Sequence, residues 1–187
     1  MKAHEVFNTI CTHQVEGMML HDQMADAFAF LGLPGFKRMH EYHFADESKG
    51  MRETSRYFIN HYNMLLEDGH PADPHVIPRG WMGYTRQQVT AETKRKAVRD
   101  LLTRWVEWER ETKKIYEKAF ADLMEEGEIA AAMRVKHMVL DVDEELEHAE
   151  KLHLRLESVM YDMPTMDQMQ DALCAKYAVK IKHLFEE

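Results

Sequence analysis

The sequence predicts an all-α protein, a bundle of four long helices followed by a fifth. Glycine and proline gather at a few breaks, and the segments between them are rich in Ala, Leu, Met, Glu, Lys and Arg, which favour helices. No segment shows the sustained period-two alternation of a strand. The breaks delimit expected helices at roughly 2–31, 36–67, 85–126, 129–161 and 165–185.

The connections predict how these helices are arranged. The breaks at Gly32–Gly35 and at Gly127 are short, so each joins two antiparallel neighbours. The link over roughly 68–84 is long enough to cross the length of a bundle. We therefore expect residues 1–187 to form a single domain, in which two hairpins are joined by a long crossover and the fifth helix lies outside or across the bundle.

Charge and composition exclude several classes of function. The formal net charge of −9 argues against binding to nucleic acid or to an anionic membrane surface. No run of eighteen apolar residues predicts a transmembrane helix, and the first residues lack an apolar signal core. Cys11 and Cys174 are too few for a disulfide framework. We expect a soluble, cytoplasmic protein.

Each long helix carries a glutamate near its middle, on or near its apolar stripe. These residues are Glu16, Glu47, Glu109 and Glu145, and the fourth helix adds His148 three residues after Glu145. Burying four carboxylates without compensation is prohibitive, and a pair of divalent cations would neutralise them. Carboxylates suit hard metals and the imidazole favours iron, manganese or zinc, so the pattern predicts a metal site in the bundle core.

Four passages give the sequence its resemblance to a known family. They are His13-Gln14-Val15-Glu16, Ala45-Asp46-Glu47-Ser48-Lys49-Gly50, Trp108-Glu109-Arg110-Glu111-Thr112 and Glu144-Glu145-Leu146-Glu147-His148. Together they resemble the ferritin-like superfamily of diiron-carboxylate proteins, nearest in pattern to bacterioferritins and rubrerythrins. The resemblance implies a ferritin-like four-helix bundle whose metal ligands are Glu16, Glu47, Glu109, Glu145 and His148, with iron as the metal and manganese or zinc as alternatives.

The second helix departs from the family pattern. The family has Glu-x-x-His there, whereas the residue three positions after Glu47 is Gly50. His43, one turn before Glu47, is a further candidate ligand, and His13, one turn before Glu16, and His61, further along the second helix, are others. The glycine has two interpretations: a bulky tryptophan or methionine approaches closely, or a coordination position is vacated and filled by water, substrate or His43.

Two functions therefore remain open from the sequence. The first is an iron-handling oxidoreductase that oxidises and stores iron, or carries out dioxygen- or peroxide-linked chemistry. Its iron-oxidation branch is favoured because two distant cysteines cannot form a rubredoxin module. The second is a non-catalytic helical scaffold with a degenerate or single-metal site. Outward apolar residues on long helices also predict a homo-oligomer.

Overall fold

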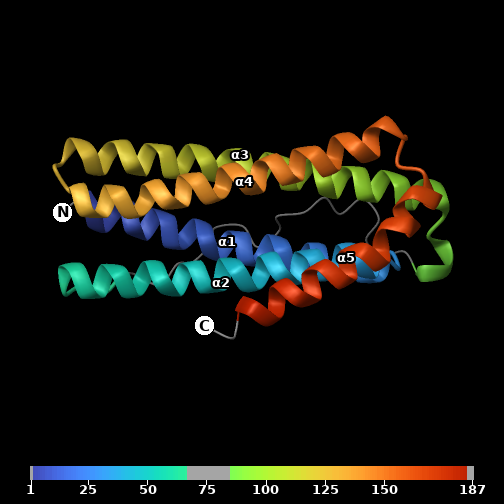
Figure 1. Cartoon of the computed structure of the whole chain (residues 1–187), viewed down its shortest axis with the longest axis horizontal. Coiled ribbons are helices and arrows are strands. Elements are labelled where there is room, and N and C mark those ends of the chain that lie inside the picture. The colour runs from blue at the N-terminus through green and yellow to red at the C-terminus, as the bar shows by residue number, and fades with distance from the viewer. Residues whose placement is uncertain (1, 67–84, 185–187) are drawn as a thin grey trace.

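The structure is a computed structural model that describes residues 2–66 and 85–184. The described chain is helical, and Figure 1 shows its long helices lying side by side. They are α1 (Lys2–Phe30), α2 (Pro34–Tyr62), the short 3₁₀ helix η1 (Arg86–Gln88), α3 (Ala91–Glu125), α4 (Ile129–Ser158) and α5 (Met163–Leu184). No strand occurs within the described ranges, so the predicted all-α class is confirmed.

Both predicted hairpin turns are present and depend on a left-handed glycine. Gly32 has a φ of 71°, and the next backbone N–H, that of Leu33, donates to the carbonyl of Phe28 at 2.9 Å. Gly127 has a φ of 76°, and the N–H that follows it donates to the carbonyl of Leu123 at 2.9 Å. Such bonds satisfy the last carbonyls of a helix while the chain reverses. The predicted crossover over 68–84 lies outside the described residues.

The second helix ends earlier than its apolar stripe suggested. α2 stops at Tyr62 rather than near residue 67. Asn63 adopts the left-handed conformation with a φ of 53°, and its N–H donates to the carbonyl of Ile59 at 2.9 Å. Asparagine tolerates this conformation better than most residues, so it closes the helix although apolar residues continue beyond it.

The third helix begins later than the sequence pattern indicated. The side chain of Thr90 accepts the backbone N–H of Thr93 at 3.1 Å, which makes Thr90 the N-cap of α3. Thr85-Arg86-Gln87-Gln88, whose spacing also fits a capping box, belongs to η1 and its preceding residue instead. There the Gln88 Oε1 accepts the N–H of Thr85 at 2.7 Å, so these residues close a single turn before α3 begins.

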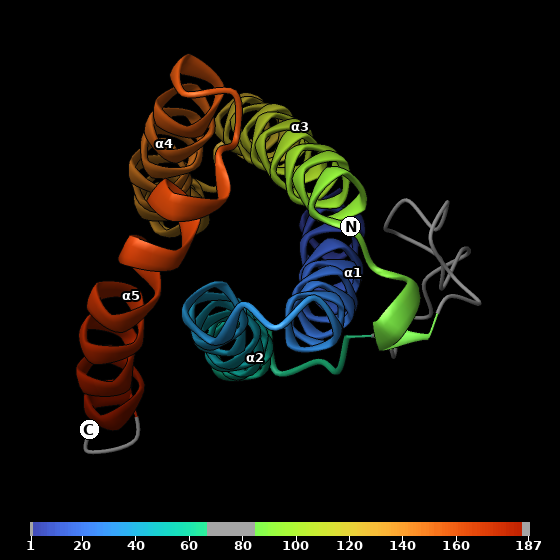
Figure 2. The same ribbon diagram turned by 90° about the vertical axis from the view of Figure 1, so that its right-hand side faces the viewer.

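The apolar core between the long helices consists of two separate clusters, one toward each end of the bundle. α1 packs along α2, α3 packs along α4, and α1 contacts α3 (Figure 2). One apolar cluster gathers around Phe28, Phe36 and Trp105, and the other around Phe7, Phe58 and Leu123. Because the helices are antiparallel, the middle of each helix falls between the two clusters, where the predicted polar residues stand.

The fifth helix docks on the start of α2. Gln170 Oε1 accepts the N–H of Gly35 at 2.8 Å, and a Cβ at Gly35 would lie 2.6 Å from the carbonyl oxygen of Gln170. The glycine therefore allows the two backbones to approach closely. α5 also brings the buried Tyr177 ring to 6.1 Å from the ring of His43. None of the helices in the described ranges is long and apolar enough to span a membrane.

Candidate metal centre

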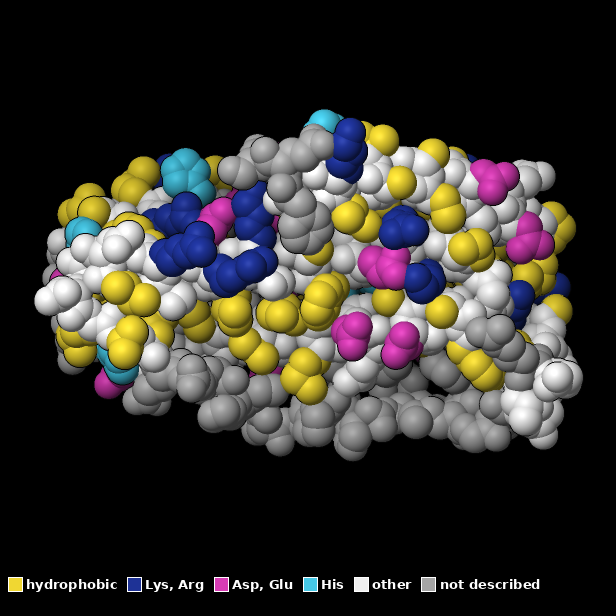
Figure 3. Space-filling view, turned by 90° about the horizontal axis from the view of Figure 1, so that it is seen from below, with side chains coloured by type: hydrophobic (Ala, Val, Ile, Leu, Met, Phe, Trp, Pro, Cys, Tyr) yellow, Lys and Arg dark blue, Asp and Glu magenta, His cyan; other side chains and the backbone are white. Residues whose placement is uncertain are grey.

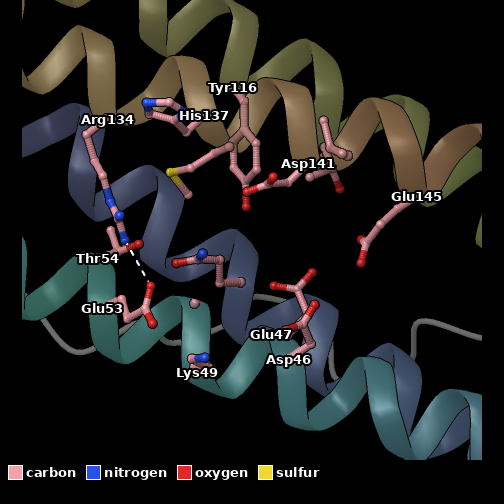
Figure 4. A pocket seen from close by; sticks show the side chains of 15 residues that line it. Asp46, Glu47, Lys49, Glu53, Thr54, Tyr116, Arg134, His137, Asp141 and Glu145 are labelled. Carbon is pink, nitrogen blue, oxygen red and sulfur yellow. Dashed lines mark hydrogen bonds and ion pairs between the residues drawn. The ribbon is translucent and has the colours of Figure 1, made fainter. Parts of the chain in front are cut away.

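Three of the predicted glutamates converge between the two apolar clusters. Glu47 comes from α2, Glu109 from α3 and Glu145 from α4. Burial raises the pKa of both Glu47 and Glu109, the charge of Glu145 raises both further, and the charge of Glu47 adds to the shift of Glu109. Figure 4 shows Glu47 and Glu145 directed into the same space from facing helices. The phase of the apolar stripes therefore places these three carboxylates together.

Glu109 is the most deeply buried of the three, with 1% of its surface exposed. Trp105 Nε1 donates to Glu109 Oε1 at 2.7 Å, whereas Oε2 has no hydrogen-bond partner among the described residues. Burial raises the pKa of Glu109 well above its usual range, and the neighbouring charges act in the same direction. A buried carboxylate oxygen without a donor is costly, and a cation would satisfy it.

The α1 residue facing Glu47 is a glycine, Gly17, which was not predicted to belong to the site. A Cβ at Gly17 would lie 2.8 Å from Glu47 Oε1 and 3.3 Å from Trp108 Cζ2. Side-chain atoms essentially never approach so closely, so Gly17 makes room for the carboxylate of Glu47. A glycine inside a long helix was the available signal, since glycine there is unfavourable unless a close approach requires it.

The surroundings of Gly50 differ from the predicted close approach of a tryptophan or methionine. Within 4 Å of a Cβ at Gly50, the residues that the structure describes place a single neighbour, Gln14 Nε2 at 3.1 Å. Gly50 also lines a cavity of about 260 Å³. The position where the family pattern has histidine thus faces open space rather than a bulky ring.

Two histidines adjoin the carboxylates from the α5 side. His43 Nδ1 lies 3.5 Å from Glu145 Oε1, and His43 Nε2 has no partner among the described residues. His148 Nε2 lies 3.5 Å from the hydroxyl of Tyr177. Burial, together with the charges of nearby lysines, lowers the pKa of His43 to about 3 and that of His148 to about 4. Both imidazoles are neutral near pH 7, the form that binds metals.

Further buried imidazoles continue from His43 into the core. His21 Nδ1 and His40 Nδ1 lie 2.9 Å apart, and the His21 ring stacks 5.1 Å from that of His43. Burial lowers the pKa of His21 and His40 well below the usual range, so this layer is uncharged. Neither residue was predicted to belong to the site. His40 stands on the same α2 stripe as His43 and Glu47, which was the signal for its inward position.

Glu16 lies apart from the other predicted ligands. Its Oε2 is 3.7 Å from His13 Nδ1, and the charges that most affect its pKa are those of Glu111 and Arg104 on α3. Its side chain remains 29% exposed. The structure therefore brings Glu47, Glu109, Glu145, His148 and His43 to one region and places Glu16 on the outer side of the α1–α3 contact.

A cavity connects the carboxylates with solvent between α2 and α4. Its walls include Asp46 and Glu53 from α2 and Asp141 and Arg134 from α4 (Figure 4). Arg134 Nη2 lies 3.1 Å from Glu53 Oε2, and this ion pair joins the two helices beside the cavity. Burial and the charge of Glu145 raise the pKa of Asp46 to about 6. The cavity wall is therefore acidic and accessible to a cation.

The side chains are close but do not form a preorganised metal-binding group. Among the described residues, no three His, Cys, Asp or Glu side chains are arranged closely enough to hold one ion. Glu109 Oε2 and His43 Nε2 nevertheless fit a metal, because both are buried atoms that have no hydrogen-bond partner in the described part of the chain. Burial raises the pKa of Glu145 to about 7, because the charged carboxylate is poorly solvated there. A bound cation would compensate for this lost solvation.

Solved structures identify the fold, while sequence comparisons give no match. No protein-family model and no curated protein sequence matches the chain. An open-pore ferritin from the hyperthermophilic archaeon Archaeoglobus fulgidus matches with a TM-score of 0.76 and 16% identity, over 93% of this chain and 95% of that one. A closed form engineered from the same ferritin gives the same values. A humanized archaeal ferritin matches with a TM-score of 0.75 and 17% identity, over 92% and 95%. The chain therefore has the ferritin fold, as its resemblance predicted.

Proposed function

We propose that this protein binds Fe(II) as its substrate at Glu47, Glu109, Glu145 and His148, with His43 as a further ligand, and promotes oxidation of the iron by dioxygen or peroxide. The buried Glu109 Oε2 carries this proposal, because no described residue donates to it and it lies near two other carboxylates. Oxygen ligands with neutral imidazoles suit iron, and manganese or zinc can use the same set. Glu16 is left out of this set because of its position.

The ferritin fold supports iron over the other metals, since the structural neighbours are ferritins. Two features support access by a cation. Gly17 leaves space beside Glu47, and the acidic cavity connects the carboxylates with solvent between α2 and α4. The side chains of this chain would hold the ion, exclude bulk water on the α1–α3 side and leave the α2–α4 side open for the oxidant.

Metal binding is expected to stabilise the folded protein. Ligand at about 100 times its dissociation constant adds about 2.7 kcal/mol to the free energy of unfolding. A protein of this size gains roughly 2–4 °C per kcal/mol, so the melting temperature should rise by roughly 5–10 °C. Anaerobic Fe(II) titration, elemental analysis and thermal unfolding measure this effect. Absence of binding, with the same melting temperature in Fe(II), Mn(II) and Zn(II), would contradict the proposal.

The scaffold function has its own support. α1 faces the site with Gly17 and Gln14 rather than a carboxylate, and no preorganised three-residue group exists among the described side chains. A single-metal or degenerate site is consistent with these observations. The two functions are separated by aerobic oxidation, because a scaffold would bind metal weakly or at one ion per chain and would leave Fe(II) unoxidised beyond the rate in buffer.

Gly50→His tests the open position beside the carboxylates. The variant is expected to fold, because the Gln14 amide is the only described group within 4 Å of a Cβ there and the cavity adjoins that position. It should bind a second metal ion more tightly or oxidise Fe(II) faster, as measured by anaerobic titration and by the rate of ferric absorbance. Gly50→Gln is the matched control, since it fills similar space without an imidazole. Equal behaviour of wild type and Gly50→His would count against a vacated ligand position.

We also propose that the protein assembles with itself. Apolar side chains on α4 stand far out in solvent, with Leu140 52% and Leu154 60% exposed. Figure 3 shows further apolar side chains lying between charged ones along one face. Burial of such side chains in a subunit contact would remove apolar area from water. Sedimentation equilibrium of the metal-free protein measures the mass, and a monomer at micromolar concentration would contradict self-assembly.

A further inference from the structure

The fourth helix carries apolar side chains on its outward face as well as on the face that it buries. Ile129, Met133, Leu140 and Leu154 are between 44% and 60% exposed. Because an α-helix turns about 100° per residue, these four side chains lie within about 60° of one another around α4, opposite the buried Ala149. Figure 2 shows α4 at the edge of the bundle, with α3 and α5 beside it. A line of exposed apolar side chains along one helix indicates a contact surface.

The spacing along this line is that of a heptad repeat. From Ile129 the other apolar residues follow at steps of four, seven and fourteen positions, and Lys136 and Glu147 lie on the same line. Both charged side chains are exposed. A seven-residue repeat keeps its side chains on one side of a helix, so that a second helix can pack along it. We call this line the outer seam of α4, and it consists of Ile129, Met133, Lys136, Leu140, Glu147 and Leu154.

The outer seam is complementary to a second copy of itself that runs in the opposite direction. A twofold axis between Asp141 and Val142 places each residue opposite the residue that lies equally far beyond the axis. Ile129 then faces Leu154 of the partner subunit, and Lys136 faces Glu147 of the partner subunit. Because a twofold contact forms each pair twice, two apolar pairs and two oppositely charged pairs result.

The order of charges along the outer seam selects this arrangement over others. A parallel pair would place Lys136 against Lys136 of the partner subunit, and a shift by one heptad in either direction would place Lys136 against Leu140 or Leu154 of the partner subunit. Like charges and an unpaired charge against an apolar side chain both disfavour an interface. Glu147 already lies 2.6 Å from Lys151 Nζ on its own helix, and its second oxygen can accept from the partner's Lys136.

Two further acidic residues beside the outer seam are neutralised within the protomer. Asp143 Oδ1 lies 2.5 Å from Lys113 Nζ, and Glu150 Oε1 lies 2.6 Å from Arg110 Nη2, so α3 supplies a cation to each. Two chains with a formal charge of −9 repel one another. The local compensation reduces this repulsion where the two copies of α4 approach.

We propose that the outer seam of α4 is the contact between two copies of this chain, which pack antiparallel about a twofold axis, an inference that rests on the proposed self-assembly. The contact extends about 38 Å from Ile129 to Leu154, at about 1.5 Å per residue. Asp141, which lines the cavity, lies about 100° around α4 from Leu140. The contact therefore uses a different face of α4 from the proposed metal ligands.

Reversal of the two seam charges tests the pairing in the full-length, metal-free protein. In Lys136→Glu alone and in Glu147→Lys alone, like charges face each other, so the dissociation constant should rise at least about 10-fold. An equimolar mixture of the two variants should regain the wild-type value, because both facing pairs are then oppositely charged. The two positions lie about 16 Å apart along one helix, so this recovery requires a contact between chains. Sedimentation equilibrium measures the dissociation constants.

Leu140→Asp tests the apolar part of the outer seam. The substitution places two carboxylates near the twofold axis, and it should lower the mass measured at micromolar concentration while the helical circular dichroism stays unchanged. Val179→Asp is the matched control, because Val179 on α5 is 56% exposed and Leu140 is 52% exposed. This control should keep the wild-type mass.

Cysteine cross-linking tests the direction of the two helices. Ile129→Cys and Leu154→Cys are prepared as separate chains, each with Cys174→Ser, because Cys174 is partly exposed and Cys11 is buried. Oxidised glutathione should join the two variants in a mixture by a disulfide between them. It should join neither variant to itself, since identical positions at the ends of an antiparallel pair lie about 38 Å apart.

The outcomes separate this contact from self-assembly in general. A monomeric wild type at micromolar concentration would contradict self-assembly and remove the α4 contact with it. A wild-type oligomer whose mass is unchanged in Leu140→Asp, or whose charge variants do not recover on mixing, would overturn the α4 contact alone. A disulfide between two copies of Ile129→Cys would also overturn it, because that bond requires parallel helices.

Discussion

Glu109→Gln is expected to weaken Fe(II) binding at least about 10-fold, while it makes the metal-free protein more stable at alkaline pH. Even the loss of an outer hydrogen-bonding partner of a metal ligand costs about 10–100-fold in affinity, and Glu109 is proposed as a ligand itself. Glutamine keeps an oxygen that can accept the bond from Trp105 Nε1. The substitution therefore removes a buried charge without removing the hydrogen bond.

The pH dependence follows from the raised pKa of Glu109. The folded protein keeps a proton that the unfolded chain loses above about pH 4.5, so the contribution to stability is complete at low pH and is lost as pH rises through the folded pKa. Each such carboxyl lowers the free energy of unfolding by up to about 1.4 kcal/mol per pH unit. Glu47, Glu145 and Asp46 act with the same sign.

The buried histidines act with the opposite sign and in a different window. The folded pKa of His13, His43 and His148 lies below the ordinary value of 6.5, so they reduce stability as pH falls below 6.5 and contribute nothing to the alkaline change. Above pH 6.5 the buried carboxyls determine how the stability of the folded protein changes with pH. The melting temperature of the metal-free wild type should therefore fall between pH 6.5 and pH 8.5, and it should fall less in Glu109→Gln.

Thermal unfolding of the metal-free proteins across this pH range measures the difference. Glu107→Gln is the matched control, because Glu107 is an exposed glutamate on the same helix and its replacement should leave the wild-type pH profile. A Glu109→Gln profile parallel to that of the wild type would show that Glu109 is charged without penalty. The proposed need for a compensating cation would then be contradicted.

Gly17→Ala is expected to separate stability from metal binding. Alanine inside a helix is favoured over glycine by about 1 kcal/mol, so the helix itself gains stability. The new Cβ would lie 2.8 Å from Glu47 Oε1, however, and the carboxylate must move away. We expect an equal or higher melting temperature for the metal-free protein and an Fe(II) affinity reduced about 10-fold, as measured by anaerobic titration.

Gly50→Ala is the matched control for this substitution. It gives the same gain in helix preference, and across the described ranges its Cβ meets only the amide at the end of the Gln14 side chain, at 3.1 Å. Its Fe(II) affinity should stay near that of the wild type. If Gly17→Ala binds Fe(II) as tightly as Gly50→Ala does, the position of Glu47 over Gly17 has no role in metal binding.

The fold and most of the convergent residues could be predicted from the sequence, because the periodicity of apolar residues along a long helix indicates which face is buried. The stripes of α2, α3 and α4 placed Glu47, Glu109 and Glu145 on inner faces, and the structure brings them together. α1 is different, since buried residues such as His13, Gln14 and Gly17 occupy a wide arc of its surface. Neighbouring residues differ by about 100° around a helix, so a wide buried arc left Glu16 and Gly17 indistinguishable by pattern.

Other features of the site depend on contacts that no local pattern contains. The pairing of His21 with His40 joins two helices across the first turn, and the ion pair of Glu53 with Arg134 joins α2 to α4. The open space at Gly50 depends on what the facing helices fail to fill. Side-chain packing between distant segments decides these features, whereas helix periodicity reports only which face turns inward.

The docking of α5 has a consequence for the order in which the chain reaches its native state during synthesis. The first backbone donors of α2 are satisfied by Gln170, and the N–H of Gly35 is separated from that side chain by 135 residues of sequence. The start of α2 therefore cannot be completed while the ribosome is still making α4. Tyr177, which packs near His43 and His148, arrives later still. The imidazoles are enclosed last, so a nascent chain still lacking α5 exposes them to any metal ion in its surroundings.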